Sequence, residues 1–215
     1  VYSEAAQASP GRAVRYSDLN FMLLGWVLEA YFGRPLDEAF AAEVAGPLAL
    51  ARTRFFPAPG ERAATAATEL DGDQRSEPGL VWGTVHDGNA FALGGVAGHA
   101  GLFAPLPELA RFVRSLLVPE EGVLSRESVA FMARPRAGTA GDVRALGWRL
   151  RPEGWGDWPQ ETIWHTGFTG TSLLVDLERG VGVVLLTNGV HPQRRMGELA
   201  AVRAGVHQLI AEALR

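Results

Sequence analysis

Apolar residues near the start of the chain follow one another so densely that they predict a buried helix. The run covers residues 19–32, and Ser17 and Asp18 precede it while Gly33 follows it. Serine and aspartate accept hydrogen bonds from the free N–H groups at a helix start, and glycine commonly ends a helix. Because apolar side chains surround the helix axis on nearly all sides, we expect this helix to lie inside the protein.

Other stretches show either a helical period or none. Helices are predicted over residues 35–45, 107–117, 125–133 and 194–214. The last is amphipathic, and its apolar side combines Met196, Leu199, Val202, Val206, Leu209 and Ile210. Residues 51–105 are instead broken by glycine and proline into short apolar pieces. An irregular stretch of this length inside a compact domain usually wraps a functional cleft.

Between residues 145 and 187 the pattern changes to short runs typical of strands. Four strands are predicted, at 145–150, 161–166, 169–176 and 180–187. The last is almost continuously apolar, which is typical of a central strand covered on both faces. Successive strands followed by a helix predict an α+β fold with an antiparallel sheet. We divide it into a mostly helical lobe with long cleft loops, residues 1–140, and the strands with the C-terminal helix, residues 141–215, as parts of one incomplete domain.

Composition excludes several classes of function. The chain has 215 residues, 47% of them apolar, and a net charge of −4 from 20 basic and 24 acidic residues spread along it. This balance predicts neither a nucleic-acid nor a membrane-surface partner, and no apolar run is long enough to span a bilayer. Cysteine is absent, which excludes thiolate chemistry but leaves the compartment open. All 20 basic residues are arginine, which cannot lose its proton to act as a base.

Candidate chemistry concentrates in residues 164–172, where small residues and hydroxyls surround a single titratable side chain, His165. Gly167 and Gly170 weaken a strand, and a chain accepts that loss where its backbone must approach a ligand or another segment closely. Such a strand can present backbone N–H groups to a carbonyl substrate. The alternative is an interior strand, rich in glycine and threonine, whose histidine is simply hydrogen-bonded.

Other candidate residues have plain structural explanations. His86 and His99 lie in the irregular region with a spacing that fits no metal pattern, so we expect them to serve loop packing and predict no metal site. Tyr16, taken alone, would be an aromatic residue at a helix entry, packed against the apolar run.

Taken together, three short motifs resemble those of the serine β-lactamase and penicillin-binding protein superfamily, in its class C β-lactamase, DD-peptidase and esterase branch. Tyr16-Ser17-Asp18 before an apolar helix resembles the Tyr-x-Asn element of that family. Gly98-His99-Ala100-Gly101-Leu102-Phe103 before a helix resembles its Ala-Gly-Gly-Leu-type segment. His165-Thr166-Gly167 resembles its Lys-Thr-Gly element, in the histidine form that some DD-peptidases use. The motifs occur in the family's order, and the resemblance covers nearly the whole chain.

The resemblance implies acyl transfer through a covalent serine ester, without a cofactor, on a small-molecule amide or ester. Tyr16 would relay a proton near the nucleophile, and a cation at His165 would assist that transfer and steady a substrate carboxylate. The backbone N–H of Phe168 would form half of the oxyanion hole. The substrate cleft would be lined by Asp18, Thr166, Gly167 and Thr169.

The sequence also departs from the family pattern. No Ser-x-x-Lys precedes Tyr16, and the one stretch with similar spacing, Ser9-Pro10-Gly11-Arg12, contains helix breakers and a cation that cannot act as the base. The family's N-terminal strands are missing too, so we expect an open sheet edge near 181–186 that the missing segment or a second chain would cover. Asp18 replaces asparagine, which argues against the usual mode of β-lactam binding and leaves an ester, a D-amino-acid peptide or another amide as the substrate.

Three functional hypotheses follow. In the first, the chain, which does not begin with methionine, is the C-terminal portion of a serine hydrolase whose nucleophile lies on another piece. In the second, it is a degenerate family member that binds peptide or peptidoglycan-like ligands without turnover. In the third, Ser172 and His165 form a catalytic dyad, although the sequence has no Gly-x-Ser-x-Gly element to support one.

Overall fold

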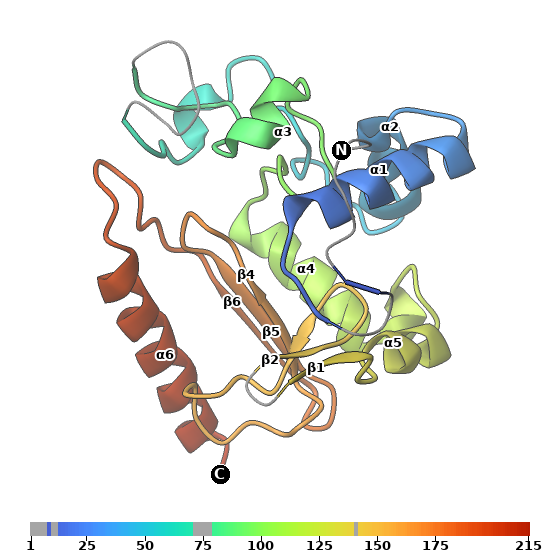
Figure 1. Ribbon diagram of the computed structural model, residues 1–215, viewed down its shortest axis with the longest axis vertical. Coiled ribbons are helices and arrows are strands. Elements are labelled where there is room, and N and C mark those ends of the chain that lie inside the picture. The colour runs from blue at the N-terminus through green and yellow to red at the C-terminus, as the bar shows by residue number, and fades with distance from the viewer. Residues whose placement is uncertain (1–7, 10–12, 71–78, 140–141) are drawn as a thin grey trace.

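The structure is a computed structural model that describes residues 8, 9, 13–70, 79–139 and 142–215. Its helices are α1 (Asp18–Phe32), α2 (Leu36–Phe40), α3 (Gly88–Ala92), α4 (Leu106–Leu117), α5 (Arg126–Met132) and α6 (Met196–Ala213). An antiparallel sheet lies between α6 on one face and α4 and α5 on the other (Figure 1). Helices α1, α2 and α3 gather at one end of the molecule. The predicted α+β class is therefore confirmed.

Six strands form the sheet, and each pairs with its neighbours in the sequence. They are β1 (Ala137–Thr139), β2 (Asp142–Arg144), β3 (Arg149–Leu150), β4 (Ile163–Thr166), β5 (Ser172–Asp176) and β6 (Val181–Leu185). β3 to β6 lie within the four predicted strands. β1 and β2 lie outside the four predicted strands; they were not predicted because they are short and polar. Gly138 makes their pairing possible, since a Cβ atom there would lie 2.2 Å from the backbone oxygen of Asp142.

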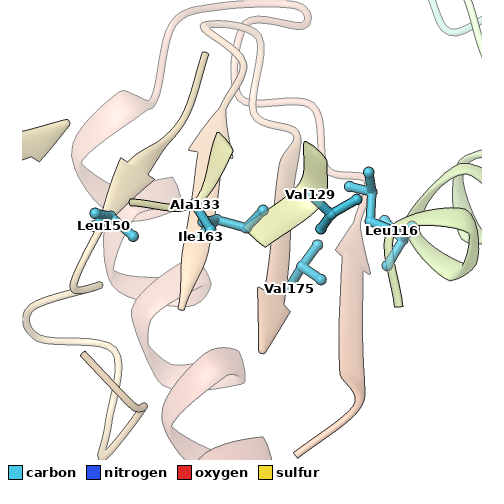
Figure 2. Packing of buried hydrophobic residues seen from close by; sticks show 7 residues of the cluster. Leu116, Val129, Ala133, Leu150, Ile163 and Val175 are labelled. Carbon is cyan, nitrogen blue, oxygen red and sulfur yellow. The ribbon is translucent and has the colours of Figure 1, made fainter. Parts of the chain in front are cut away.

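The main core lies between the sheet and the pair α4 and α5. Ile163 and Val175 are cross-strand partners with no exposed surface. Side chains of α4 and α5, among them Leu116 and Val129, pack against them in the same cluster (Figure 2). Full burial of a side chain of this size contributes about 1.5–3 kcal/mol, so this layer supplies much of the driving force for folding.

The second face of the sheet packs against α6, but only part of the predicted side of that helix is buried. Val202 and Leu209 are 54% and 67% exposed. The buried positions are Leu199, which was predicted, and His207 and Ala211, which were not. The prediction missed these two because it selected large apolar residues, whereas His207 is buried through a ring stack on Trp155, at 4.2 Å between centroids.

Helix α1 begins and ends as predicted but is not buried as predicted. The Ser17 hydroxyl accepts from the N–H of Leu19, and Gly33 ends the helix with φ 65°. Only Met22 and Gly25 are buried. Large apolar side chains along the rest of the helix are exposed, namely Phe21, Leu23, Leu24, Val27, Leu28 and Tyr31. No helix in the part of the chain that the structure describes is long and apolar enough to cross a membrane.

The irregular region between α2 and α4 is held by specific hydrogen bonds. Helix α2 continues into a π-helical turn, Ala41–Ala45. The buried carboxylate of Glu108 in α4 accepts from the backbone N–H groups of Arg52 and Thr53 and from the Thr53 hydroxyl at 2.6 Å. A carboxylate with several charge-assisted donors ties this segment firmly to the helix that covers the sheet.

At one edge of the sheet lies β6, with no strand beyond it among the described residues. The apolar run predicted a strand covered on both faces. Val183 is buried, whereas Val181 and Val184 are partly exposed. The outer edge of β6 pairs with no described strand. Open edges of this kind favour pairing with another chain.

Candidate active site

Tyr16 and His165 share a neighbourhood that contains two arginines. Tyr16 lies in the extended segment before α1 and is 70% exposed. The guanidinium carbon of Arg144, on β2, lies 5.6 Å from the centre of the Tyr16 ring. Arg144 and Arg149 are both near enough to His165, on β4, to lower its pKa. Arg144 is therefore a ring contact of Tyr16 and an electrostatic neighbour of His165.

The geometry of His165 defines its protonation. Its Nδ1 atom lies 3.0 Å from the carbonyl oxygen of Thr166, and because a carbonyl can only accept, Nδ1 carries the hydrogen. Burial is the largest cause that lowers the pKa of His165. The hydrogen bond to Thr166 raises this pKa, while the charges of Arg144 and Arg149 lower it further. The ring is therefore neutral at pH 7, and Nε2 offers a lone pair. The resemblance led us to expect a cation at His165, but the neighbouring arginines hold the positive charge.

The charge of the two arginines is only partly compensated. Asp142 lies 2.8 Å from Arg144 Nε and 3.1 Å from Arg149 Nη2. Burial opposes ionisation of Asp142, but the two arginines outweigh it, so its pKa is lowered and it stays charged. Two guanidinium groups against one carboxylate leave a net positive charge, which contributes to the lowered pKa of His165.

The turn after β4 presents a free backbone donor. Gly167 N–H donates to the carbonyl of Thr171 at 2.8 Å, which closes the turn. Gly170 has φ 134°, and a Cβ atom there would lie 2.6 Å from the carbonyl oxygen of Thr187, so only glycine fits. None of the described residues accepts a hydrogen bond from the N–H of Phe168. This donor is available to a ligand, as an oxyanion hole requires.

The Phe168 ring contacts two residues, His86 and Arg194, that were not predicted to lie near it. The His86 ring stacks on it, with 5.7 Å between centroids and 20° between planes. The Arg194 guanidinium carbon lies 5.5 Å from its centre. Glu69 binds both neighbours, with Oε2 at 2.9 Å from His86 Nε2 and 3.0 Å from Arg194 Nη2. These residues are far apart in sequence, and no local pattern could have revealed the cluster.

The carboxylate of Asp18 accepts a hydrogen bond from the irregular region. The side-chain amide of Asn89 donates to Asp18 Oδ2 at 3.2 Å. Nearby, His99 Nε2 lies 2.8 Å from Asp87 Oδ1, and ligand atoms of Asp18, Asp87 and His99 all lie within 4.8 Å of one another. Asp87 also accepts from the Ala90 N–H at 2.8 Å, so protein donors already occupy it. We interpret the group as a hydrogen-bonded junction between α1 and α3.

The proposed dyad of Ser172 and His165 is not formed. Ser172 is 2% exposed, and its hydroxyl lies 3.2 Å from Nε2 of His207 on α6. Its cross-strand partner is Thr166, whereas that of His165 is Leu173. Because neighbouring strand residues face opposite sides, Ser172 and His165 point to different faces of the sheet.

The remaining predicted cleft residues surround the turn. Thr166 and Gly167 join β4 to it, and the Thr169 carbonyl accepts from the N–H of Gly189 at 2.7 Å. Their contact with substrate stays a prediction. A pocket of about 290 Å³ between α2 and residues 53–56 is lined by none of the candidate residues, so the candidate site lies outside that cavity.

Comparison with known proteins settles the family. The profile of the β-lactamase family matches residues 1–208. The chain belongs to the β-lactamase family. A putative D-alanyl-D-alanine carboxypeptidase of Escherichia coli O157:H7 is 34% identical over 209 aligned positions, and one of Salmonella typhi is 32% identical. Each alignment covers 85% of this chain but 46% of the relative, so the chain spans about half the length of the curated relatives it matches.

Solved structures of β-lactamase-like proteins share this fold. A hydrolase with promiscuous acyltransferase activity, EstCE1, superimposes with a TM-score of 0.71 at 25% identity over 94% of this chain and 57% of its own. A penicillin-binding protein homologue from Pyrococcus abyssi gives 0.70 at 20% identity over 96% and 44%. The β-lactamase-like sheet with its C-terminal helix is therefore confirmed.

Proposed function

We propose that this chain carries the tyrosine, histidine and oxyanion part of a serine hydrolase, and that it acts through an acyl-enzyme on an amide or ester. Among the substrates considered, a D-amino-acid peptide or its ester fits best, ahead of a β-lactam. The nucleophile and its lysine base would come from a Ser-x-x-Lys segment outside this sequence, because the chain has no lysine.

The observation that carries the proposal is that Arg144 lies against the Tyr16 ring and also lowers the pKa of His165, while the unoccupied Phe168 N–H follows three residues after His165. Membership of the β-lactamase family supports it, as does the similarity to proteins named putative D-alanyl-D-alanine carboxypeptidases. The net positive charge of Arg144 and Arg149 suits a substrate that ends in a carboxylate.

Each group has a task that its geometry allows. The Tyr16 hydroxyl would pass a proton between the nucleophile and the leaving group, and neutral His165 would accept a hydrogen bond through Nε2 during that transfer. The Phe168 N–H would stabilise the negative charge on the tetrahedral intermediate, an interaction worth about 2.7–4 kcal/mol in known enzymes.

Intact mass spectrometry tests the proposal. The purified chain, of 23.0 kDa, is treated with a fluorophosphonate or a penicillin, alone and together with the polypeptide that carries Ser-x-x-Lys. We expect no adduct on the chain alone and one adduct on the serine of the complemented protein. An adduct on this chain itself would contradict our assignment of the nucleophile.

Two matched variants separate catalysis from packing. Tyr16→Phe should slow acylation of the complemented protein by a factor on the order of 10²–10⁴, because a proton relay is lost. Tyr31→Phe removes the same hydroxyl from a tyrosine that is 80% exposed on α1, and it should leave the rate unchanged. Substrate binding without any acylation in the complemented protein would favour the non-catalytic, ligand-binding alternative.

A further inference from the structure

Residues His86, Asp87, Gly88 and Asn89, here called the 86–89 segment, contact two of the three family motifs and the residue that follows the third. His86 stacks on Phe168, which follows the His165-Thr166-Gly167 motif. Asp87 binds His99 at 2.8 Å, within the Gly98–Phe103 motif. Asn89 donates to Asp18, the last residue of the Tyr16-Ser17-Asp18 motif, at 3.2 Å. The motifs are distant in sequence, and four consecutive residues bring them into one network.

The segment is anchored at both ends, so its contacts are not independent of one another. Val85 before it is 7% exposed, and Ala90 after it is fully buried in the same apolar cluster. The Asp87 carboxylate accepts from the Ala90 N–H at 2.8 Å and so caps α3. A segment this short with two buried ends moves as a unit, because close-packed interiors transmit displacement.

Glu69 supports the contact between His86 and Phe168, the residue that offers the free N–H. The side chains of His86 and Glu69 are 10% and 13% exposed, and their hydrogen bond at 2.9 Å fixes the imidazole plane against Phe168. Glu69 also binds Arg194, which lies against the same Phe168 ring. The direction of the free Phe168 N–H is therefore tied to the position of His86.

The contact with α1 accounts for the aspartate in the first motif. A carboxylate can only accept, and Asp18 directs its oxygen to the amide of Asn89. Asp18 is the first residue of α1, with Ser17 as its cap and Tyr16 just before. The Asn89 amide thus fixes the helix start from which the Tyr16 side chain extends.

We propose that the 86–89 segment sets the position of Tyr16 relative to the Phe168 N–H, with Asn89 and His86 as positioning residues. The proposal rests on the proposed function only for what Tyr16 and Phe168 do; the mechanical coupling is a property of the fold. No turnover is therefore needed to test it, and its failure would leave the proposed function standing.

The test follows the backbone amide signal of Phe168 in ¹H–¹⁵N spectra of the chain. Asn89→Asp places two carboxylates face to face at Asp18, and we expect the Phe168 signal to shift although Asn89 does not touch that residue. Combining Asp18→Asn with Asn89→Asp restores a donor opposite an acceptor and should return the Phe168 signal toward its original position. A shift without this recovery would overturn the proposal.

Asn20→Asp is the matched control, because it makes the same change on an exposed residue of α1 whose side-chain amide donates to the Arg15 carbonyl at 3.3 Å. It should leave the Phe168 signal in place. If Asn89→Asp fails to fold, His86→Gln tests the coupling in the other direction, and the Asp18 amide should then shift. Shifts confined to the immediate neighbours of either substitution would overturn the proposal.

Discussion

The central sheet and helix α1 are both strongly apolar in sequence, yet they differ in burial. Ile163, Leu174 and Val175 in the sheet have no exposed surface. Val27 and Tyr31 on α1 are 60% and 80% exposed. Apolar content therefore indicates that a segment favours burial, but it does not indicate which of its faces are buried within this chain.

The partners explain the difference. The sheet is covered by α4 and α5 on one face and by α6 on the other (Figure 1). Helix α1 contacts α2 and the backbone near Gly98, where a Cβ atom would lie 2.1 Å from the Phe21 carbonyl oxygen. This close approach buries one narrow face of α1 and leaves the apolar remainder in solvent.

The largest effect should come from truncating the sheet core. Leu174→Ala removes a fully buried side chain and should lower the free energy of unfolding by about 2–5 kcal/mol, since a cavity remains. Leu24→Ala makes the same change at a side chain that is 51% exposed, and should cost about 0.5 kcal/mol or less. Urea denaturation measures both, and equal losses would contradict the exposed position of α1.

The second effect concerns His207, buried between α6 and the sheet. Burial lowers its pKa to about 4, and the charge of Arg203 adds to the effect. Because the unfolded chain binds the proton more tightly, stability is complete above about pH 6.5 and falls as the pH drops toward 4, by roughly 2–3 kcal/mol. Denaturation at a series of pH values gives the slope.

His207→Gln removes the titration while keeping a polar partner for Ser172, so it should flatten this slope. His191→Gln, at an exposed histidine, should leave the slope as it is. A slope that persists undiminished in His207→Gln would show that another group causes the acid sensitivity.

A third, smaller effect should appear where the irregular region meets the sheet. Arg194 binds Glu69, and the hydrogen bond to Arg194 lowers the pKa of Glu69 despite burial. Arg194→Ala should cost about 1–2 kcal/mol, because a largely buried carboxylate loses a charged donor. The adjacent Arg195 is 68% exposed and lies 4.0 Å from its only ion-pair partner among the described residues, Glu198, so Arg195→Ala should cost less than about 0.5 kcal/mol. Thermal unfolding compares the two.

The smallest effect on stability should follow polar substitution on α1. Replacing Val27 and Tyr31 together by glutamate should change the free energy of unfolding by no more than about 1 kcal/mol, because both are exposed. The same substitutions should reduce self-association in sedimentation experiments, since the apolar patch is interrupted. A large loss of stability would mean that α1 is covered within this chain.

Much of the fold could be predicted from the sequence. Helix α1 was bounded correctly because Ser17 and Gly33 act locally, and β4 to β6 were found because their apolar runs are short and interrupted by turns. Helix α3 was missed, since it has only five residues. The buried side of α6 was predicted only in part, because the His207 ring stack depends on Trp155, far away in sequence.

The candidate site divides in the same way. Tyr16, His165 and the Phe168 turn were predicted from short motifs, and the structure brings Tyr16 and His165 to the same arginine. The neutral state of His165 was not predicted, because it results from burial and from charges on other strands. His86 was treated as loop packing and Asn89 was not singled out, since their partners lie elsewhere in the chain.

The sequence by itself determined the helix boundaries, the order of strands, the family motifs and the absence of lysine, because these depend on neighbouring residues or on composition. Only the tertiary structure decided which apolar faces are buried, which charges surround His165 and how the 86–89 segment joins the motifs. Burial and electrostatic fields act between atoms that are close in space, and chain order does not specify those distances.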